Sequence, residues 1–480
     1  MYPQVSLKDY DGLNGFGSSS MRDVNELSKA LSAGTAVSGQ TGGSSLRVES
    51  LESSLKVVTF TNKHIKLWKK IAKSPAYSTV EEFNVLSNYG AAGAFGFTRE
   101  GELPQSQDST YSRQTALVKF MGTTRSVTHP MTLVNPAHGD VVALENQNGI
   151  LWLLERVEDS LFHGNSDLAF DGESEQWDGL DALINSANVV DLEASPLQEA
   201  DIEEASNLVI ENFGYPTDMF LGTRPMSDLV KTFYPRERVQ LPAPTDGKVG
   251  LAVQTMATQA GVIEFNPDVF LKQQKTAPAA ATSPNAPAAP KSITGDAGSA
   301  TDSEWAKQLG AAPAATSFQY AVTACNRFGE SAPTFATALI DLTADELAAK
   351  NDVLLSVTNA VAVGAHPPEY FIIYRSKPRT AVTTDPTLVS EIARVKATTQ
   401  AADTAAAAPS DKNVQMPFTF TAYLGEMSPS VLTFRQLAPL MKMDLAVLAP
   451  AYRWMIMLYG TPIMFAPKKW VKMINIGQLS

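Results

Sequence analysis

The alternation of apolar and polar positions predicts an extended two-stranded ribbon in the first third of the chain. Residues 77–88 (YSTVEEFNVLSN) and 114–127 (QTALVKFMGTTRSV) are rich in the β-branched and aromatic residues that favour strands. The segment between them, residues 90–113, is polar and contains four glycines and one proline. Strands joined by so long a tip form an extended hairpin, and an isolated two-stranded ribbon is barely stable in water. We therefore expect the ribbon to need another surface to lie across.

A period near 3.6 predicts a long helix over residues 139–162. Apolar residues recur on one of its faces: Leu144, Leu151, Leu154, Val157 and Leu161. A second helix is expected from Ser195, as N-cap, to about Phe213. Pro196 suits the first turn of that helix, and Gln198 stands where a capping box needs it.

The N-terminal segment is expected to be a flexible arm with one short amphipathic helix. Residues 11–49 are rich in Gly and Ser, and Leu27 and Leu31 lie at helical spacing within them. The flanking chain is too polar to cover such a helix, so a neighbouring subunit is the expected partner.

Two Ala/Pro-rich stretches, residues 276–290 and 400–409, enclose a region with a different pattern. Short β-like runs occur in and just after it: 318–325, 334–342, 353–358, 370–374, 388–395 and 418–423. Turn signals separate these runs at the spacing of a β-sandwich. We predict an α+β chain with a small sandwich inserted into a larger domain, and with the Ala/Pro stretches as semi-extended connections.

One stretch near the C-terminus, residues 445–466, is apolar and long enough to span a membrane. Arg453 lies near its middle, where a charge costs about 2.5–3.5 kcal/mol, and prolines and a glycine interrupt it. We therefore predict buried strands here and no membrane association. The N-terminus lacks the pattern of a secretory signal.

Charge and chemistry narrow the function further. The net charge is −12, so we expect no basic cluster of the kind that binds nucleic acid. The single cysteine, Cys325, excludes an internal disulfide framework and is expected to be a small buried apolar residue.

The residues that could carry catalysis or bind metal are dispersed. The five histidines have no second ligand at helical spacing, and the acidic loop 165–178 lacks the spacing of a calcium loop. No nucleophile or phosphate-binding motif is complete. We expect no catalytic residue, cofactor or metal, and therefore no enzyme.

Several segments, in one order, resemble the major capsid proteins of tailed bacteriophages, above all those of large contractile-tailed phages. The first is LESSLKVVTFTNKHIKLWKKIAKSPAYSTVEEFNV at residues 51–85. The others are GFTRE at 96–100, FHGNSDL at 162–168, WDGLDALI at 177–184, GYPTDMFL at 214–221, YLGEMS at 423–428 and APKKW at 466–470. Within 275–422 the resemblance is weaker, although YAVTACNRFGESAPT at 320–334 resembles an immunoglobulin or fibronectin type III module.

This resemblance implies a Hong Kong 97-type fold. Its parts would be an N-terminal arm (1–72), an extended loop (73–132), peripheral and axial domains (133–274 and 424–480) with a spine helix at 139–162, and an immunoglobulin-like insertion (275–423). It also implies a coat protein that assembles into hexamers and pentamers of an icosahedral head around double-stranded DNA, without specific DNA binding. Residues 90–113 contain no lysine for the isopeptide of cross-linked relatives, so a non-covalent shell is expected.

The resemblance implies a location in the virion after assembly in the host cytoplasm, with portal, scaffolding and decoration proteins as further partners. The expected contacts between subunits are Glu81, Glu82, Phe95, Phe97, Arg99, Glu100, Glu102, Tyr111 and Arg113 in the extended loop, and Leu27 and Leu31 in the arm. An alternative is a virion or tail adhesin that uses the sandwich to bind a host surface. Copy number would separate the two, since a coat needs hundreds of copies and an adhesin only a few dozen.

Overall fold

The computed structural model describes residues 59, 61–90, 96–134, 139–170, 175–233, 254–271, 274–310, 313–360, 366–447 and 449–479. The chain divides into two compact units. One comprises Met1–Val58 and Pro130–Leu144, and the other comprises Thr59–His129 and Glu145–Ser480. The predicted arm helix with Leu27 and Leu31, and also Phe95, lie outside the described residues. The contacts reported below lie within the second unit.

A four-stranded sheet forms one part of this unit, in the order β1 (Ala72–Pro75), β21 (Leu432–Asp444), β22 (Ala451–Met464) and β4 (Lys119–Thr128). β1 runs parallel to β21, and the other pairs are antiparallel. The apolar C-terminal run is thus a strand, as predicted. No described helix is long and apolar enough to cross a membrane.

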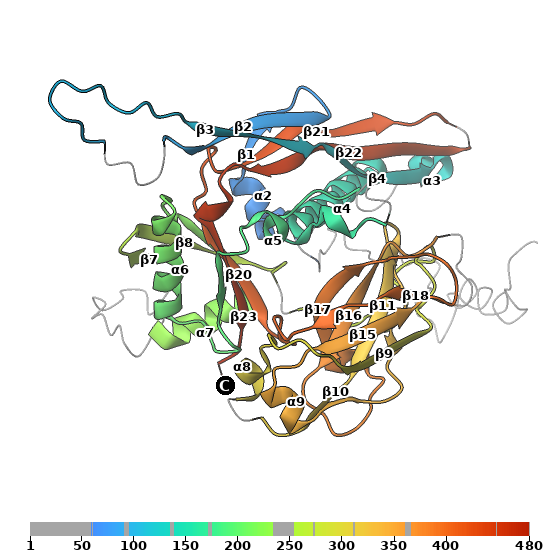
Figure 1. Cartoon of the computed structure of the whole chain (residues 1–480). Coiled ribbons are helices and arrows are strands. Elements are labelled where there is room, and N and C mark those ends of the chain that lie inside the picture. The colour runs from blue at the N-terminus through green and yellow to red at the C-terminus, as the bar shows by residue number, and fades with distance from the viewer. Residues whose placement is uncertain are drawn as a thin grey trace, which may run out of the picture. The chain divides into compact units, whose positions relative to one another are not determined.

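The predicted long helix is α4 (Val141–His163), and it packs on this sheet (Figure 1). A Cβ atom built at Gly149 would lie only 2.6 Å from Cδ1 of Ile456 on β22, so the absence of a side chain there permits the close approach. The apolar face of α4 includes the fully buried Leu153, Val157 and Phe162. Periodicity in the sequence therefore placed this element correctly.

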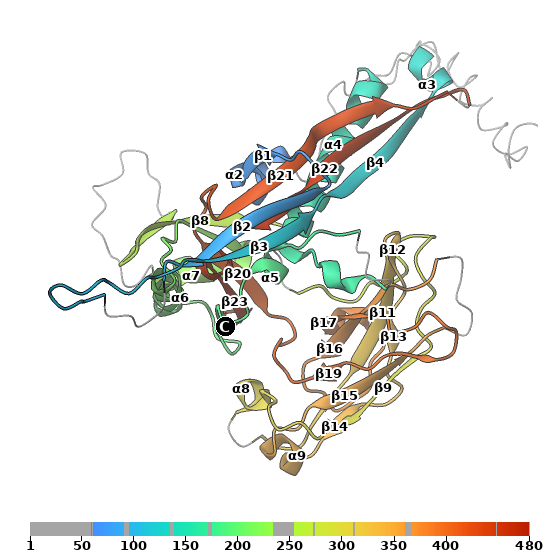
Figure 2. The same cartoon turned by 45° about the horizontal axis from the view of Figure 1, so that its top comes forward.

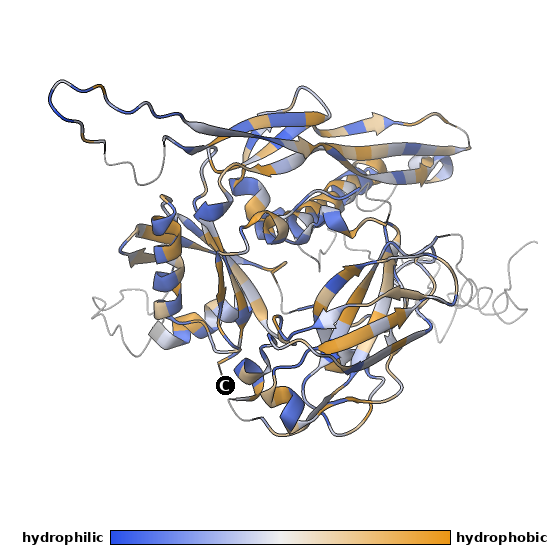
Figure 3. Cartoon of the chain, viewed as in Figure 1, coloured by the Kyte–Doolittle hydropathy of each residue, from blue (hydrophilic) through white to orange (hydrophobic). Residues whose placement is uncertain are grey.

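A six-stranded sheet has the order β5 (Val189–Asp191), β23 (Trp470–Ile476), β20 (Phe420–Gly425), β6 (Asp218–Gly222), β8 (Gly261–Asp268) and β7 (Thr255–Thr258). Its core includes residues of α6 (Glu199–Glu211) and of α7 (Thr223–Phe233). Figure 3 shows hydrophobic residues concentrated along its central strands. The run 418–423, which was expected beside the sandwich strands, therefore pairs as β20 in this sheet instead.

The N-cap predicted for α6 is wrong. The helix is capped by Gln198, whose N–H donates to Asp201 Oδ2 at 2.8 Å. Ser195 instead donates its N–H to Leu192 O at 2.8 Å and accepts the N–H of Gly477 at 2.8 Å. These bonds hold Ser195 in a turn against the C-terminal strand, which no local capping pattern reveals.

The predicted sandwich is present as two facing sheets with one shared core. One sheet contains β11 (Tyr320–Asn326), β12 (Gly329–Glu330), β13 (Thr334–Phe335), β16 (Tyr370–Ser376) and β17 (Val389–Lys396). The other contains β9 (Ser292–Ala297), β15 (Val353–Thr358), β18 (Ala405–Ala407) and β19 (Ser410–Asp411). A third, small sheet pairs β10 (Thr316–Phe318) with β14 (Ile340–Leu342).

The second Ala/Pro stretch is not a mere connection. β18 pairs with β15, and Ala406 and Ala407 are buried in the sandwich core. Alanine fits there because its side chain fills little space between the two sheets, so composition alone misjudged this segment.

The remaining helical segments among the described residues are short. They are η3 (Asn62–His64), α2 (Leu67–Lys70), α3 (His129–Leu133), η4 (Ser166–Leu168), α5 (Leu180–Leu183), α8 (Trp305–Leu309), α9 (Ala344–Ala348), η5 (Pro386–Leu388) and η6 (Pro467–Lys469).

Candidate assembly surfaces

The predicted ribbon consists of β2 (Val80–Asn88) and β3 (Thr110–Leu117), which pair with each other and, among the described residues, with no third strand. β3 is exposed at seven of its eight positions, and on β2 only alternate residues are half-buried. Tyr111 on β3 is 68% exposed. A two-stranded sheet with so little cover is marginal by itself. The ribbon therefore has little cover from the rest of the described subunit.

The second predicted strand run, 114–127, does not stay in the ribbon. Val118 interrupts it, and from Lys119 onward the chain is β4, which pairs with β22. The N–H of Val118 donates to Thr79 O at 2.9 Å, which closes the base of the ribbon. Figure 2 shows the ribbon continuing directly from β4. Alternation predicted both strands correctly but could not show that the partner changes.

One aromatic contact holds the ribbon to the body. The Phe83 ring on β2 meets the Phe465 ring edge-on, with centroids 5.1 Å apart. Phe83 lies on the half-buried face of β2, so the opposite face of the ribbon stays open.

Glu81 and Glu82 point to opposite faces, as their adjacency on a strand predicts. Glu81 Oε1 accepts the backbone N–H of Tyr77 at 3.0 Å. Glu82 Oε2 lies 3.3 Å from Nη1 of Arg113 on β3. Both carboxylates therefore have partners in their own ribbon, and their expected contacts between subunits stay a prediction.

The described part of the ribbon tip, residues 96–109, is almost entirely exposed. Phe97 is 92% exposed and Leu103 is 93% exposed. The predicted contact residues Arg99, Glu100 and Glu102 are also exposed there. Two large apolar side chains of this short segment are therefore open to solvent in the isolated subunit.

A basic segment, which was not predicted, precedes the ribbon in the sequence. Residues 53–80 contain six lysines and no acidic residue, so the expectation of no basic cluster is wrong. We call the described part of this segment the lysine strap. Its members are Lys63, Lys66, Lys69, Lys70 and Lys73.

A buried carboxylate holds the lysine strap in place. Glu158 of α4, fully buried, accepts the backbone N–H groups of Lys66, Leu67 and Trp68 at 2.8, 2.7 and 2.9 Å. A carboxylate at this position satisfies the otherwise unpaired N–H groups at the start of α2. Burial and then the charge of Glu158 raise the pKa of Asp268, at the end of β8, to about 8.

A polar cluster joins the end of α4 to the six-stranded sheet. His163 Nδ1 lies 2.7 Å from Oδ2 of Asp181, and both Lys472 Nζ and the Tyr423 hydroxyl lie 2.7 Å from Oδ1. Burial alone would lower the pKa of His163, but the hydrogen bond and charge of Asp181 raise it above its ordinary value. The cluster is paired within the subunit and serves its stability.

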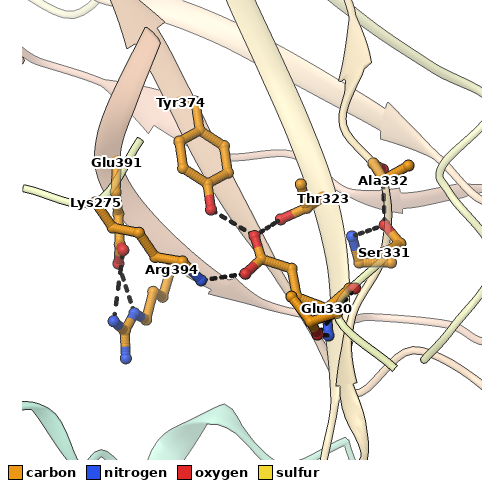
Figure 4. A network of polar contacts seen from close by, with 10 residues as sticks. Lys275, Thr323, Glu330, Ser331, Ala332, Tyr374, Glu391 and Arg394 are labelled. Atoms are coloured by element: carbon orange, nitrogen blue, oxygen red, sulfur yellow. Dashed lines mark hydrogen bonds and ion pairs between the residues drawn. The ribbon is translucent and has the colours of Figure 1, made fainter. Parts of the chain in front are cut away.

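A second buried network ties the chain entering the sandwich to its sheet (Figure 4). Glu330 Oε1 accepts the hydroxyl hydrogens of Thr323 at 2.8 Å and Tyr374 at 2.5 Å, and Glu330 also forms an ion pair with Lys275. Burial and the Glu330 charge raise the pKa of Tyr374. Cys325 is buried and free, as predicted. Among the described residues, no group of three His, Cys, Asp or Glu side chains could hold a metal.

Comparison with known proteins finds similarity to phage coat proteins. Residues 69–285 match the family model described as SU10 major capsid protein. The chain is 25% identical over 449 residues to the major capsid protein of Staphylococcus phage K, with 92% of each chain covered. It is also 27% identical to a putative major capsid protein of Enterococcus phage phiEF24C over 95% of both chains. The chain is thus similar to phage major capsid proteins over nearly its whole length.

Solved structures similar to this chain include that of Gordonia phage Cozz, with 9% identity and a TM-score of 0.43, covering 92% of this chain and 95% of that one. Another is the capsid of cyanophage P-SCSP1u, with 8% identity and a TM-score of 0.42, covering 92% and 96%. The structure contains both helices and sheets, as the predicted α+β class requires. The immunoglobulin-like identity of its insertion stays a prediction.

Proposed function

We propose that copies of this capsid protein assemble into hexamers and pentamers through the β2–β3 ribbon, which lies over an adjoining copy. The observation that carries the proposal is a two-stranded sheet that pairs with no third strand in the described part of the chain and has exposed apolar side chains along it and at its tip. Burying one such side chain contributes about 1.5–3 kcal/mol. An assembled neighbour is the surface that would supply this burial in every subunit at once.

The anchors in this proposal are Phe97, Leu103 and Tyr111, since apolar and aromatic side chains dominate the energy of interfaces. Arg99, Glu100 and Glu102 would contribute orientation more than affinity, because exposed ion pairs are each worth about 0–1 kcal/mol. Phe95, Leu27 and Leu31 remain predicted contacts. Glu81, Glu82 and Arg113 also remain predicted contacts, and the ion pair of Glu82 with Arg113 would stiffen the ribbon.

The remaining parts of the proposal follow from the role of a shell. The chain would divide into arm, extended loop, peripheral and axial domains and insertion, at the boundaries expected from the sequence. The shell would enclose double-stranded DNA without specific binding, and it would be non-covalent. Portal, scaffolding and decoration proteins would be its partners in the virion, after assembly in the host cytoplasm, and the subunit would have no catalytic role.

The test is to replace residues 90–108 by a two-residue Asn-Gly turn, which leaves both ribbon strands in place. We expect a soluble, folded subunit that forms no shells in cells expressing the phage head proteins. Circular dichroism checks the fold, and negative-stain microscopy counts particles. Intact shells from this variant would refute the proposal.

A finer variant separates loss of contact from loss of structure. Phe97→Ser with Leu103→Ser removes two exposed anchors, and Val382→Ser with Val414→Ser is the matched control on the insertion, where both valines are 52% exposed. The first pair should abolish shells and the second should leave their yield unchanged. Equal yields from both pairs would exclude Phe97 and Leu103 as anchors.

A further inference from the structure

The lysine strap is a concentrated positive charge on an acidic protein. Lys70 is already neutralised, since its Nζ lies 2.5 Å from Asp218 Oδ1 and 2.9 Å from Glu264 Oε2. Lys63, Lys69 and Lys73 are exposed, and no ion pair to them is present among the described residues. These three ammonium groups are thus available to an anionic partner.

The strap is preorganised for such a contact. Glu158 fixes its backbone through three N–H groups, and β1 joins its end to β21. Lys73 Nζ donates to Trp68 O at 2.9 Å and lies 4.3 Å from the centre of the Trp68 ring. Rigid placement lowers the entropic cost of forming ion pairs, so the strap is a better docking surface than loose lysines would be.

The ribbon tip carries the opposite charge. Glu100, Glu102 and Asp108 are exposed, and Arg99 is the one base among residues 96–109. No ion pair to these three carboxylates occurs within the described part of the chain. The N–H of Glu102 donates to Arg99 O at 3.1 Å, so a turn holds this end of the tip together.

No ion pair joins the tip to the strap of the same subunit within the described residues. β2 covers Val80–Asn88 between β1 and the tip, roughly 30 Å at about 3.3 Å per residue. The contact between Phe83 and Phe465 fixes the ribbon to the body partway along this length. A second molecule could therefore supply the partner that the tip lacks in its own subunit.

We propose that the acidic tip, through Glu100, Glu102 and Asp108, docks on the lysine strap, through Lys63, Lys69 and Lys73, of a second copy of this chain. The inference rests on the proposed function and adds the receiving surface to it. Opposite charges of matched density select this partner and its register, while the apolar anchors Phe97 and Leu103 supply most of the affinity.

Charge reversal and its rescue test the pairing. In cells expressing the phage head proteins, Glu100→Lys with Glu102→Lys should lower the yield of sedimenting shells at least tenfold, and Lys69→Glu with Lys73→Glu should do the same. A chain with all four changes should recover at least half of the wild-type yield. Asp341→Lys with Asp345→Lys is the matched control, because it changes the net charge equally at exposed sites on the insertion.

Each other outcome overturns the inference in a recognisable way. If the tip reversal assembles normally while the Asn-Gly replacement of residues 90–108 does not, the tip docks elsewhere and the proposed function stands. If the strap reversal forms normal shells that hold less DNA, the strap serves nucleic acid instead. Failure of the fourfold variant to recover, with both pairs folded by circular dichroism, would also refute the pairing.

Discussion

Replacing Asp268 by Asn should stabilise the subunit, and the gain should grow with pH. Asp268 is fully buried, its Oδ1 accepts the N–H of Phe270 at 2.7 Å, and its Oδ2 has no donor. Burial and the neighbouring carboxylate of Glu158 raise the pKa of Asp268 to about 8. The folded subunit therefore binds a proton here at neutral pH that the unfolded chain does not hold.

The magnitude follows from linkage. Between pH 4 and 8 the folded state binds more protons than the unfolded state at this site, so the free energy of unfolding falls as pH rises. The pKa lies about four units above the ordinary value, and each unit corresponds to about 1.4 kcal/mol, so the loss by pH 8 is on the order of several kcal/mol. Asn cannot titrate, and its amide can donate to Glu158 at every pH. Asp268→Asn should thus match the wild type near pH 4 and exceed it by several kcal/mol at pH 8.

The assay is guanidinium unfolding at pH 5, 6, 7 and 8, followed by circular dichroism on subunits that carry the tip replacement and stay unassembled. Asp228→Asn is the control with the opposite sign. Burial alone would raise the pKa of Asp228, but Lys231, the Leu479 N–H and Arg224 lower it. That variant should be less stable than the wild type at pH 7, with the gap closing toward acid. A constant difference between Asp268→Asn and wild type across pH would refute the reasoning.

Two further predictions concern buried polar contacts. Arg375, fully buried, lies 2.5 Å from Asp411 Oδ2, so Arg375→Ala should destabilise the sandwich by about 3–5 kcal/mol. Limited proteolysis should then cut within the insertion while shells still form, and unchanged resistance would contradict this. The ion pair of charged His163 with Asp181 stabilises the fold fully below pH 6.5 and is lost as pH rises through the raised pKa of His163. His163→Asn should therefore remove the loss of stability that the wild type shows above pH 6.5 in guanidinium unfolding, and an equal slope in both proteins would count against it.

The sequence predicted those elements whose pattern is local and long. Leu154, Val157 and Leu161 repeat at helical spacing because the second half of α4 buries one face, so periodicity was sufficient to place the helix. Alternation likewise found both strands of the ribbon. A local pattern does not predict structure that depends on a distant segment. At Ser195, where a helix cap was expected, the N–H of Gly477 donates to the backbone oxygen and fixes a turn instead.

The candidate surface was predictable to a similar extent. Exposure of Phe97 and Tyr111 follows from a ribbon with no cover, and the sequence predicted that ribbon. The pairing of Glu82 with Arg113 did not follow, because it depends on the register between β2 and β3, which a long tip leaves open. The lysine strap could have been predicted from the sequence, because residues 53–80 contain six lysines and no acidic residue. The net charge of −12 describes the whole chain and does not reveal such a local cluster.

The placement of the two proposed partners has a consequence for the symmetry of assembly. The strap leads into β1, the ribbon leads into β4, and these strands form opposite edges of one four-stranded sheet. Tip and strap are different surfaces, so a contact between them is head-to-tail, and repeating a head-to-tail contact generates a ring when its rotation closes. The four paired strands β1, β21, β22 and β4 lie between the strap and the ribbon. They would hold the angle between these two surfaces nearly constant from one subunit to the next. Hexamers and pentamers would differ by about 12° in that angle, and we expect the junction between ribbon and sheet at Val118 to absorb the difference.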